Sequence, residues 1–192
     1  KLLIKTCNLP DEYTINTPNL QTLGLKETYV KKLQYGKMDK LKYLSLGLNV
    51  IQNGKEKASP VTVLDLQKSK NIAELSVTGC RINKLDLSSV NKTLRLASIT
   101  QSGKYPIKQV RLGKMAALKG LSVSAKCAAI DASKCSRLNT LECASYGIFK
   151  VKLPKSVQYL TLTSLDKKGC KSLKLSNCKK LKALKVIGCK KL

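Results

Sequence analysis

Apolar residues recur along this chain in a short phrase with a two-residue period. The phrase reads L-x-x-L-x-L, with apolar fourth and sixth residues and mostly polar third and fifth residues. Such alternation is typical of a β-strand that buries one face. Clear copies are LKYLSL from Leu41 and VQYLTL from Val157, while NKTLRL from Asn91 is a weaker copy. The pattern therefore predicts a mainly β protein.

The copies of this phrase follow one another at a regular interval. Their fourth residues are Leu23, Leu44, Leu75, Leu94, Leu121, Leu141, Leu160 and Leu184. Most lie about twenty residues apart and a few lie farther apart, which is typical of a solenoid with loop insertions. We therefore predict about eight stacked coils in a single solenoid domain over residues 1–192.

A second phrase alternates with the first, as in INKLDL from Ile82 and IFKVKL from Ile148. The step from the second phrase to the first is nearly constant, whereas the step from the first to the second varies. We therefore expect two parallel strand ladders, with the inserted loops on one edge. The long steps contain residues 47–60, 97–106 and 163–169, whose Gly, Pro, Asn and Ser content predicts irregular turns.

Five of the eight cysteines occupy one equivalent position in the turn that follows a strand. They are Cys7, Cys80, Cys135, Cys178 and Cys189. A small thiol there would fill the space between coils and donate weakly to a backbone carbonyl. Disulfides and zinc are the alternatives, but Ser156 falls in the coil between Cys135 and Cys178, and the chain has neither C-x-x-C nor His. We expect structural thiols and no cofactor.

The phrase LSVTGCRINKLDLS, residues 75–88, resembles the L-x-L-x-x-C/N-x-L phrase of leucine-rich repeats. LNTLECASYGIFKVKL and LKLSNCKKLKAL resemble the bacterial surface versions of that repeat, the internalin-like and BspA-like groups. The resemblance spans nearly the whole chain. It implies a leucine-rich-repeat solenoid that is extracellular or at a bacterial cell surface. Since the chain begins and ends within a phrase, we expect a fragment of a longer surface protein.

The third and fifth residues of each first phrase should form columns on the exposed face of the solenoid. In the weaker copy these residues are Thr93 and Arg95. The side chains on this face are mostly small and polar, and their charges nearly cancel. Such a face suits either a solvated sheet or a ligand-binding surface. The candidate binding residues there are Tyr43, Ser45, Tyr159 and Thr161.

The charge is strongly lopsided, with 37 basic against 11 acidic residues and a net charge of +26. Lysines crowd the C-terminal end, including Lys179, Lys180, Lys182, Lys190 and Lys191. Such a field would attract an anionic polymer, for example an acidic glycan, although a lysine coat also keeps a repeat protein soluble. The few arginines and aromatic residues argue against nucleic acid.

Groups for catalysis are scarce in this sequence. It has no His, no G-x-S-x-G, no P-loop and no G-x-G-x-x-G phrase, so we do not expect an enzyme. No apolar run of about 18 residues exists, so we expect no membrane insertion. These observations predict a non-catalytic binding or adhesion module that engages a protein or glycan partner. A structural spacer and an electrostatic binder of anionic polymers are the alternatives.

Overall fold

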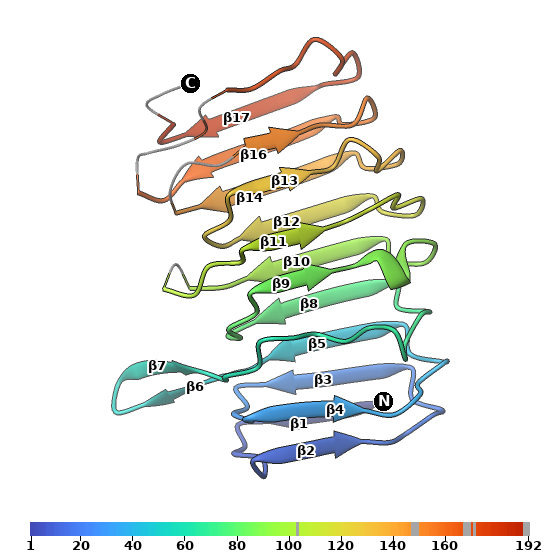
Figure 1. Cartoon of the computed structure of the whole chain (residues 1–192), viewed down its shortest axis with the longest axis vertical. Helices are drawn as coiled ribbons and strands as arrows, with labels where there is room; N and C mark the ends of the chain where they lie inside the picture. Colours follow the sequence, from blue (N-terminus) through green and yellow to red (C-terminus); the bar gives the residue numbers. More distant parts are fainter. Residues whose placement is uncertain (103, 147–149, 167–169, 171, 190–192) are drawn as a thin grey trace.

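The chain folds into successive coils that stack into an elongated solenoid (Figure 1). The computed structural model describes residues 1–102, 104–146, 150–166, 170 and 172–189. Within these ranges nine strands pair in parallel in one large sheet, in their order along the chain. They are β1 (Leu2–Lys5), β3 (Thr22–Lys26), β5 (Tyr43–Gly47), β8 (Glu74–Thr78), β10 (Leu96–Thr100), β12 (Gly120–Ser124), β14 (Thr140–Ser145), β16 (Tyr159–Ser164) and β17 (Ala183–Ile187). The predicted β-solenoid of stacked coils is confirmed.

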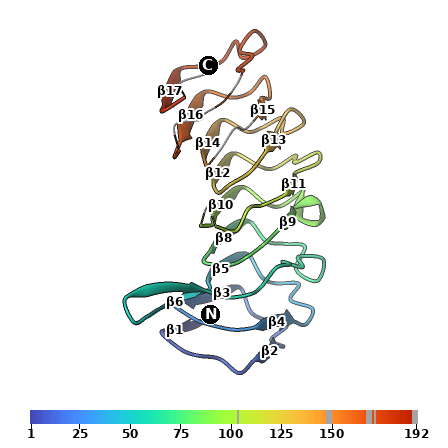
Figure 2. The same ribbon diagram turned by 60° about the vertical axis from the view of Figure 1, so that its left-hand side comes forward.

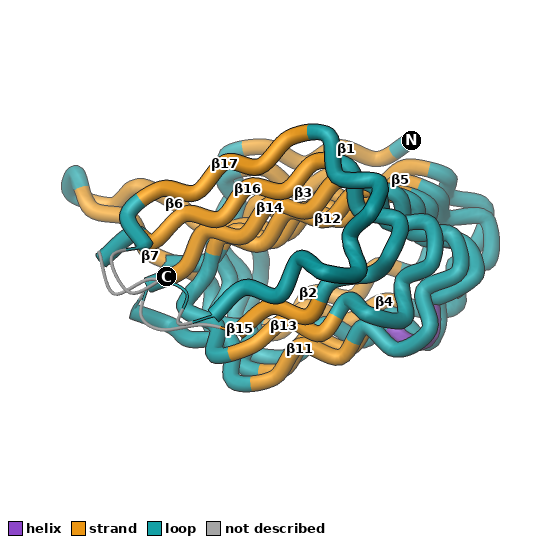
Figure 3. Tube along the Cα trace, turned by 90° about the horizontal axis from the view of Figure 1, so that it is seen from above, coloured by secondary structure: helices purple, strands orange, loops and turns teal. Residues whose placement is uncertain are grey.

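A second row of shorter strands closes the coils on the other side (Figure 3). Its parallel pairs are β2 (Glu12–Ile15) with β4 (Lys32–Tyr35), β9 (Lys84–Asp86) with β11 (Gln109–Arg111), and β13 (Ala129–Asp131) with β15 (Lys150–Lys152). The second predicted ladder is thus broken into short pairs in the described residues. Strand β2 was not predicted, because its inward residues are Tyr13 and Ile15 and it does not repeat the leucine phrase.

Equivalent residues of the first phrase pair in register and form the core. Leu23 pairs with Leu44, and Leu44 pairs with Leu75. All three are at most 2% exposed, between the large sheet and the second row. Burying a leucine contributes roughly 1.5–3 kcal/mol, so each coil is held mainly by its neighbours.

The weaker copy of the phrase lies three residues from where the sequence placed it. Ala97, not Leu94, pairs with Leu75 and Leu121 in the neighbouring strands. The phrase is therefore LRLASI, in which Leu94 is the buried first residue and a small alanine takes the place of the fourth leucine. As a result, Thr93 and Arg95 leave the exposed face of the sheet.

The insertion at residues 47–60 is also more ordered than predicted. It forms an antiparallel hairpin of β6 (Asn49–Gln52) and β7 (Lys55–Ala58), which projects from the left edge of the stack in Figure 1. Asn53 and Gly54 form its turn with φ values of 52° and 71°. Such left-handed values are characteristic of tight hairpin turns, for which Asn-Gly is strongly preferred. The Asn53-Gly54 pair is therefore the sequence signal for this hairpin.

The helical content of the described residues is one short 3-10 segment, η1 (Ser88–Val90). No helix in this part of the chain has the length and apolar character needed to cross a membrane.

Candidate functional site

The outer face of the large sheet carries the four predicted binding residues in two columns. Tyr43 and Tyr159 belong to one column, and Ser45 and Thr161 belong to the next, since the strands pair in continuous register. The second column is a ladder of small polar residues over four consecutive strands, namely Ser45, Ser76, Ser98 and Ser122. Both tyrosines are 45% exposed.

This face is hollowed. Figure 2 shows the strands of the large sheet following an arc whose open side faces away from the second row. A groove of about 760 Å³ runs over this face from β1 to β14, and we call it the sheet groove. Tyr43 and Ser45 line it, whereas Tyr159 and Thr161 lie beyond it on the same face. Five strand steps separate the tyrosines, or about 24 Å at 4.8 Å per step. A single small ligand cannot touch both.

Two leucines that sequence reasoning did not assign to this face are its main apolar contacts. Leu3 and Leu96 are each 47% exposed and both line the sheet groove. Each leans over a glycine of the next strand. A Cβ on Gly24 would lie 2.7 Å from Leu3 Cδ1, and a Cβ on Gly120 would lie 2.9 Å from Leu96 Cδ2. Correct alignment of LRLASI with its neighbours would have identified Leu96.

The sheet groove differs in charge from the rest of the molecule. Glu74 and Glu142 line it, and Lys26 is the one basic residue among the described residues that line it. Lys26 Nζ lies 3.6 Å from Glu27 Oε1, so part of its charge is already compensated. Within a chain of net charge +26, this face suits an apolar or basic segment better than an acidic polymer.

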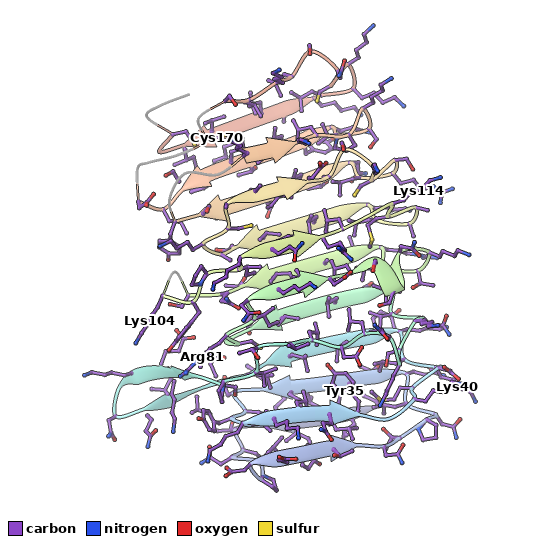
Figure 4. The ribbon with its side chains drawn as sticks, viewed as in Figure 1. Tyr35, Lys40, Arg81, Lys104, Lys114 and Cys170 are labelled. Atoms are coloured by element: carbon purple, nitrogen blue, oxygen red, sulfur yellow. The ribbon has the colours of Figure 1, made fainter. Side chains whose placement is uncertain are left out.

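The predicted C-terminal lysines lie elsewhere. Lys179, Lys180 and Lys182 are exposed in the turn that precedes β17, while Lys190 and Lys191 are outside the described residues. Figure 4 shows Lys40 and Lys114, which precede other strands of the large sheet, projecting from the right-hand edge of the stack. These lysines therefore lie at the edge where the second row turns back into the large sheet.

The thiols lie largely where the sequence placed them. All eight are free, and Cys80, Cys135 and Cys178 are buried in their predicted turns. Cys80 Sγ lies 3.6 Å from the Thr78 carbonyl oxygen two residues earlier. Cys7 makes the equivalent contact to Lys5 at 2.9 Å, but it is exposed because its coil has no neighbour on the outer side.

Several acidic residues serve turns of the second row. Asp131 Oδ1 accepts hydrogen bonds from the Ser133 hydroxyl at 2.6 Å and from the Ser133 backbone N–H at 3.1 Å. These bonds, with Lys152 3.1 Å away, hold the pKa of Asp131 below its ordinary value. Asp86 makes the same two bonds to Ser88. Among the described residues, no three His, Cys, Asp or Glu side chains gather as metal ligands would.

In comparisons with known proteins, no protein-family model, curated protein or solved structure matches the chain.

Proposed function

We propose that this chain is a leucine-rich-repeat module of a bacterial cell-surface or secreted protein, and that it binds a protein partner without catalysis. The repeated L-x-L-x-x-C/N-x-L phrase and its in-register stacking support the leucine-rich-repeat assignment. The extracellular location rests on the resemblance to bacterial surface repeats. The sheet groove is the observation that carries the binding role.

A protein partner suits the sheet groove better than an acidic glycan for two reasons. Exposed Leu3, Tyr43 and Leu96 offer apolar contacts, and the small serines of the neighbouring column also line the groove. Exposed aromatic and aliphatic anchors of this kind dominate protein interfaces. In addition, Glu74 and Glu142 would repel an anionic polymer and attract a basic segment.

The test places a photoreactive amino acid at exposed Ser98, in the middle of the groove, and at Val63 on the second row as a control. Val63 is 66% exposed, so it is equally accessible to a partner. We expect a partner that crosslinks from position 98 and not from position 63.

The variant Leu96→Ser should then weaken binding of that partner about tenfold or more, because an anchoring leucine contributes roughly 1.5–3 kcal/mol when buried. Val63→Ser, a matched loss of an exposed aliphatic side chain, should leave the affinity unchanged. Equal effects of the two variants would contradict a role for the sheet groove. Failure of both positions to capture any partner would favour a spacer instead.

A further inference from the structure

A second groove lies at the edge where the turns from the second row enter the large sheet. It has a volume of about 600 Å³, and we call it the basic groove. Among the described residues, its lining includes five basic side chains and no carboxylate. The five are Lys42, Lys92, Arg95, Lys119 and Arg137. All five are exposed.

The backbone fixes the spacing of three of these cations, with the uncharged Ala73 between the first and the second. Ala73 N–H donates to the Lys42 carbonyl at 2.8 Å, Arg95 N–H to the Ala73 carbonyl at 2.7 Å, and Lys119 N–H to the Arg95 carbonyl at 2.8 Å. These residues thus occupy one equivalent position in four consecutive coils, about 4.8 Å apart per coil. In the next coil the equivalent residue is Asn139, whose N–H donates to the Lys119 carbonyl at 2.9 Å, and Arg137 lies two residues before it in the same turn. The cations that line the groove therefore span four coil steps, or about 19 Å.

None of these cations is neutralised within the described residues. The six ion pairs found there use other side chains. The arginines outside the groove have partners, since Arg81 stacks 4.7 Å from the Tyr105 ring centre and Arg111 lies 3.6 Å from Asp86. Arg95 and Arg137 have no ion pair in the part of the chain that the structure describes. Like charges held in adjacent coils repel one another, and an anionic ligand would relieve that repulsion.

We propose that the basic groove binds a linear polymer that carries sulfate or phosphate esters. A row of about 19 Å accommodates several successive anions of an extended chain. Arginine presents a planar fork that can bind two oxygens of a sulfate or phosphate, whereas lysine acts as a point charge. Tyr43 is the single aromatic residue among the described residues that line it, so this lining lacks the series of stacking platforms that single-stranded nucleic acids use.

This site does not include the predicted lysine cluster, and Tyr43 is the one described residue that it shares with the sheet groove. Lys179, Lys180 and Lys182 precede β17 on the same edge and do not line the basic groove. They lie farther along the stack than the cations of the basic groove. Leu96 belongs to the sheet groove and does not line the basic groove. Leu96→Ser should therefore leave polyanion affinity unchanged, which keeps this proposal distinguishable from the protein-binding one.

The experiment measures affinity for a heparin octasaccharide and for poly(glycerol phosphate) by titration calorimetry at physiological salt. Arg95→Gln with Arg137→Gln should weaken binding about tenfold or more. The matched control, Lys55→Gln with Lys104→Gln, removes the same charge from exposed residues on the opposite edge, where Figure 4 shows Lys104. It should change affinity less than about twofold, because charges beyond about 8 Å are screened.

A second variant keeps the proposal testable even if the glutamine pair disturbs the fold. Arg95→Lys with Arg137→Lys retains the charge and removes both forks, and should weaken binding about threefold or more. If the arginine variants weaken binding of heparin alone, the ligand carries sulfate esters. If they weaken binding of poly(glycerol phosphate) alone, it carries phosphate esters. Equal losses in the groove and control variants would overturn the proposal. So would tighter binding of an oligothymidine of equal charge, which would indicate a nucleic-acid site.

Discussion

At the scale of single residues, the turn that follows a strand of the large sheet accounts for three of the eight cysteines, Cys7, Cys80 and Cys189. Thr28, Cys80 and Cys189 each direct a side-chain donor at the carbonyl oxygen two residues earlier. Thr28 and Cys80 are also fully or almost fully buried. In these coils the position holds a small side chain with one donor, which is either a thiol or the Thr28 hydroxyl.

The burial of Cys80 predicts a loss of stability at high pH. Desolvation raises the pKa of its thiol from 9.0 to about 12. The folded state therefore favours the neutral thiol, and this contribution is complete below pH 9 and is lost as the pH rises toward 12. Cys80→Thr removes the titrating group and keeps the donor that Thr28 uses.

We expect urea unfolding to show that wild type loses about 1 kcal/mol more than Cys80→Thr between pH 8 and pH 10. The other buried thiols titrate in both proteins and cancel in this comparison. Tyr35 is coupled to Cys80, but burial keeps both groups neutral in the folded state up to pH 10, so this coupling does not act in the range compared. Parallel pH profiles for the two proteins would show that the thiol does not titrate as its burial implies.

At the scale of elements, the strands are set by the phrase and the connections are set by local backbone chemistry. The hairpin turn needs left-handed φ at Gly54, and the turn after β8 needs it at Gly79, with φ values of 71° and 69°. Their surroundings differ. A Cβ at Gly54 would meet nothing within 4 Å, whereas a Cβ at Gly79 would lie 2.5 Å from Asn49 Cβ.

These surroundings predict unequal costs for the same substitution. Gly54→Ala meets only the backbone penalty and should lower the free energy of unfolding by about 1 kcal/mol. Gly79→Ala meets that penalty and a clash with the strand β6, and should cost about 3 kcal/mol. Urea denaturation of both variants measures the difference. Equal costs would mean that β6 moves aside freely, which would make the hairpin a loosely attached element.

The same contrast shows how far the sequence could predict the structure. Alternating apolar residues identify the strands of the large sheet wherever the first phrase is intact, because a two-residue period is typical of a strand. Where a small residue takes the fourth position, as at Ala97, the phrase is hard to recognise. The alignment predicted from the sequence was therefore shifted by three residues from the observed strand register. That shift removed Leu96 from the predicted binding face and placed Arg95 on it. The basic groove could not be predicted from the sequence, because its lining residues come from turns of different coils that become neighbours only in the fold.

At the scale of the whole molecule, each coil contacts only the coils before and after it, so stability should vary along the stack. The buried positions of the last strand show this directly. Leu184 and Val186 are 44% and 37% exposed, whereas Leu160 and Leu162, their partners in β16, are 1% and 0% exposed.

We therefore predict a gradient in amide hydrogen exchange along the solenoid of this chain. Amides of β17 should exchange about a hundredfold faster than those of β12, because the last coil can open without breaking contacts among the central coils. Leu184→Ala should accelerate exchange in β17 and leave β12 unchanged. Leu121→Ala, a deletion at the equivalent but buried position, should reduce protection in β10, β12 and β14 together, since all three pack around it. Mass spectrometry after deuteration resolves these strands. Equal protection of β12 and β17 would mean that the stack opens only as a whole, and the last coil would then be held by contacts other than the burial of its leucines.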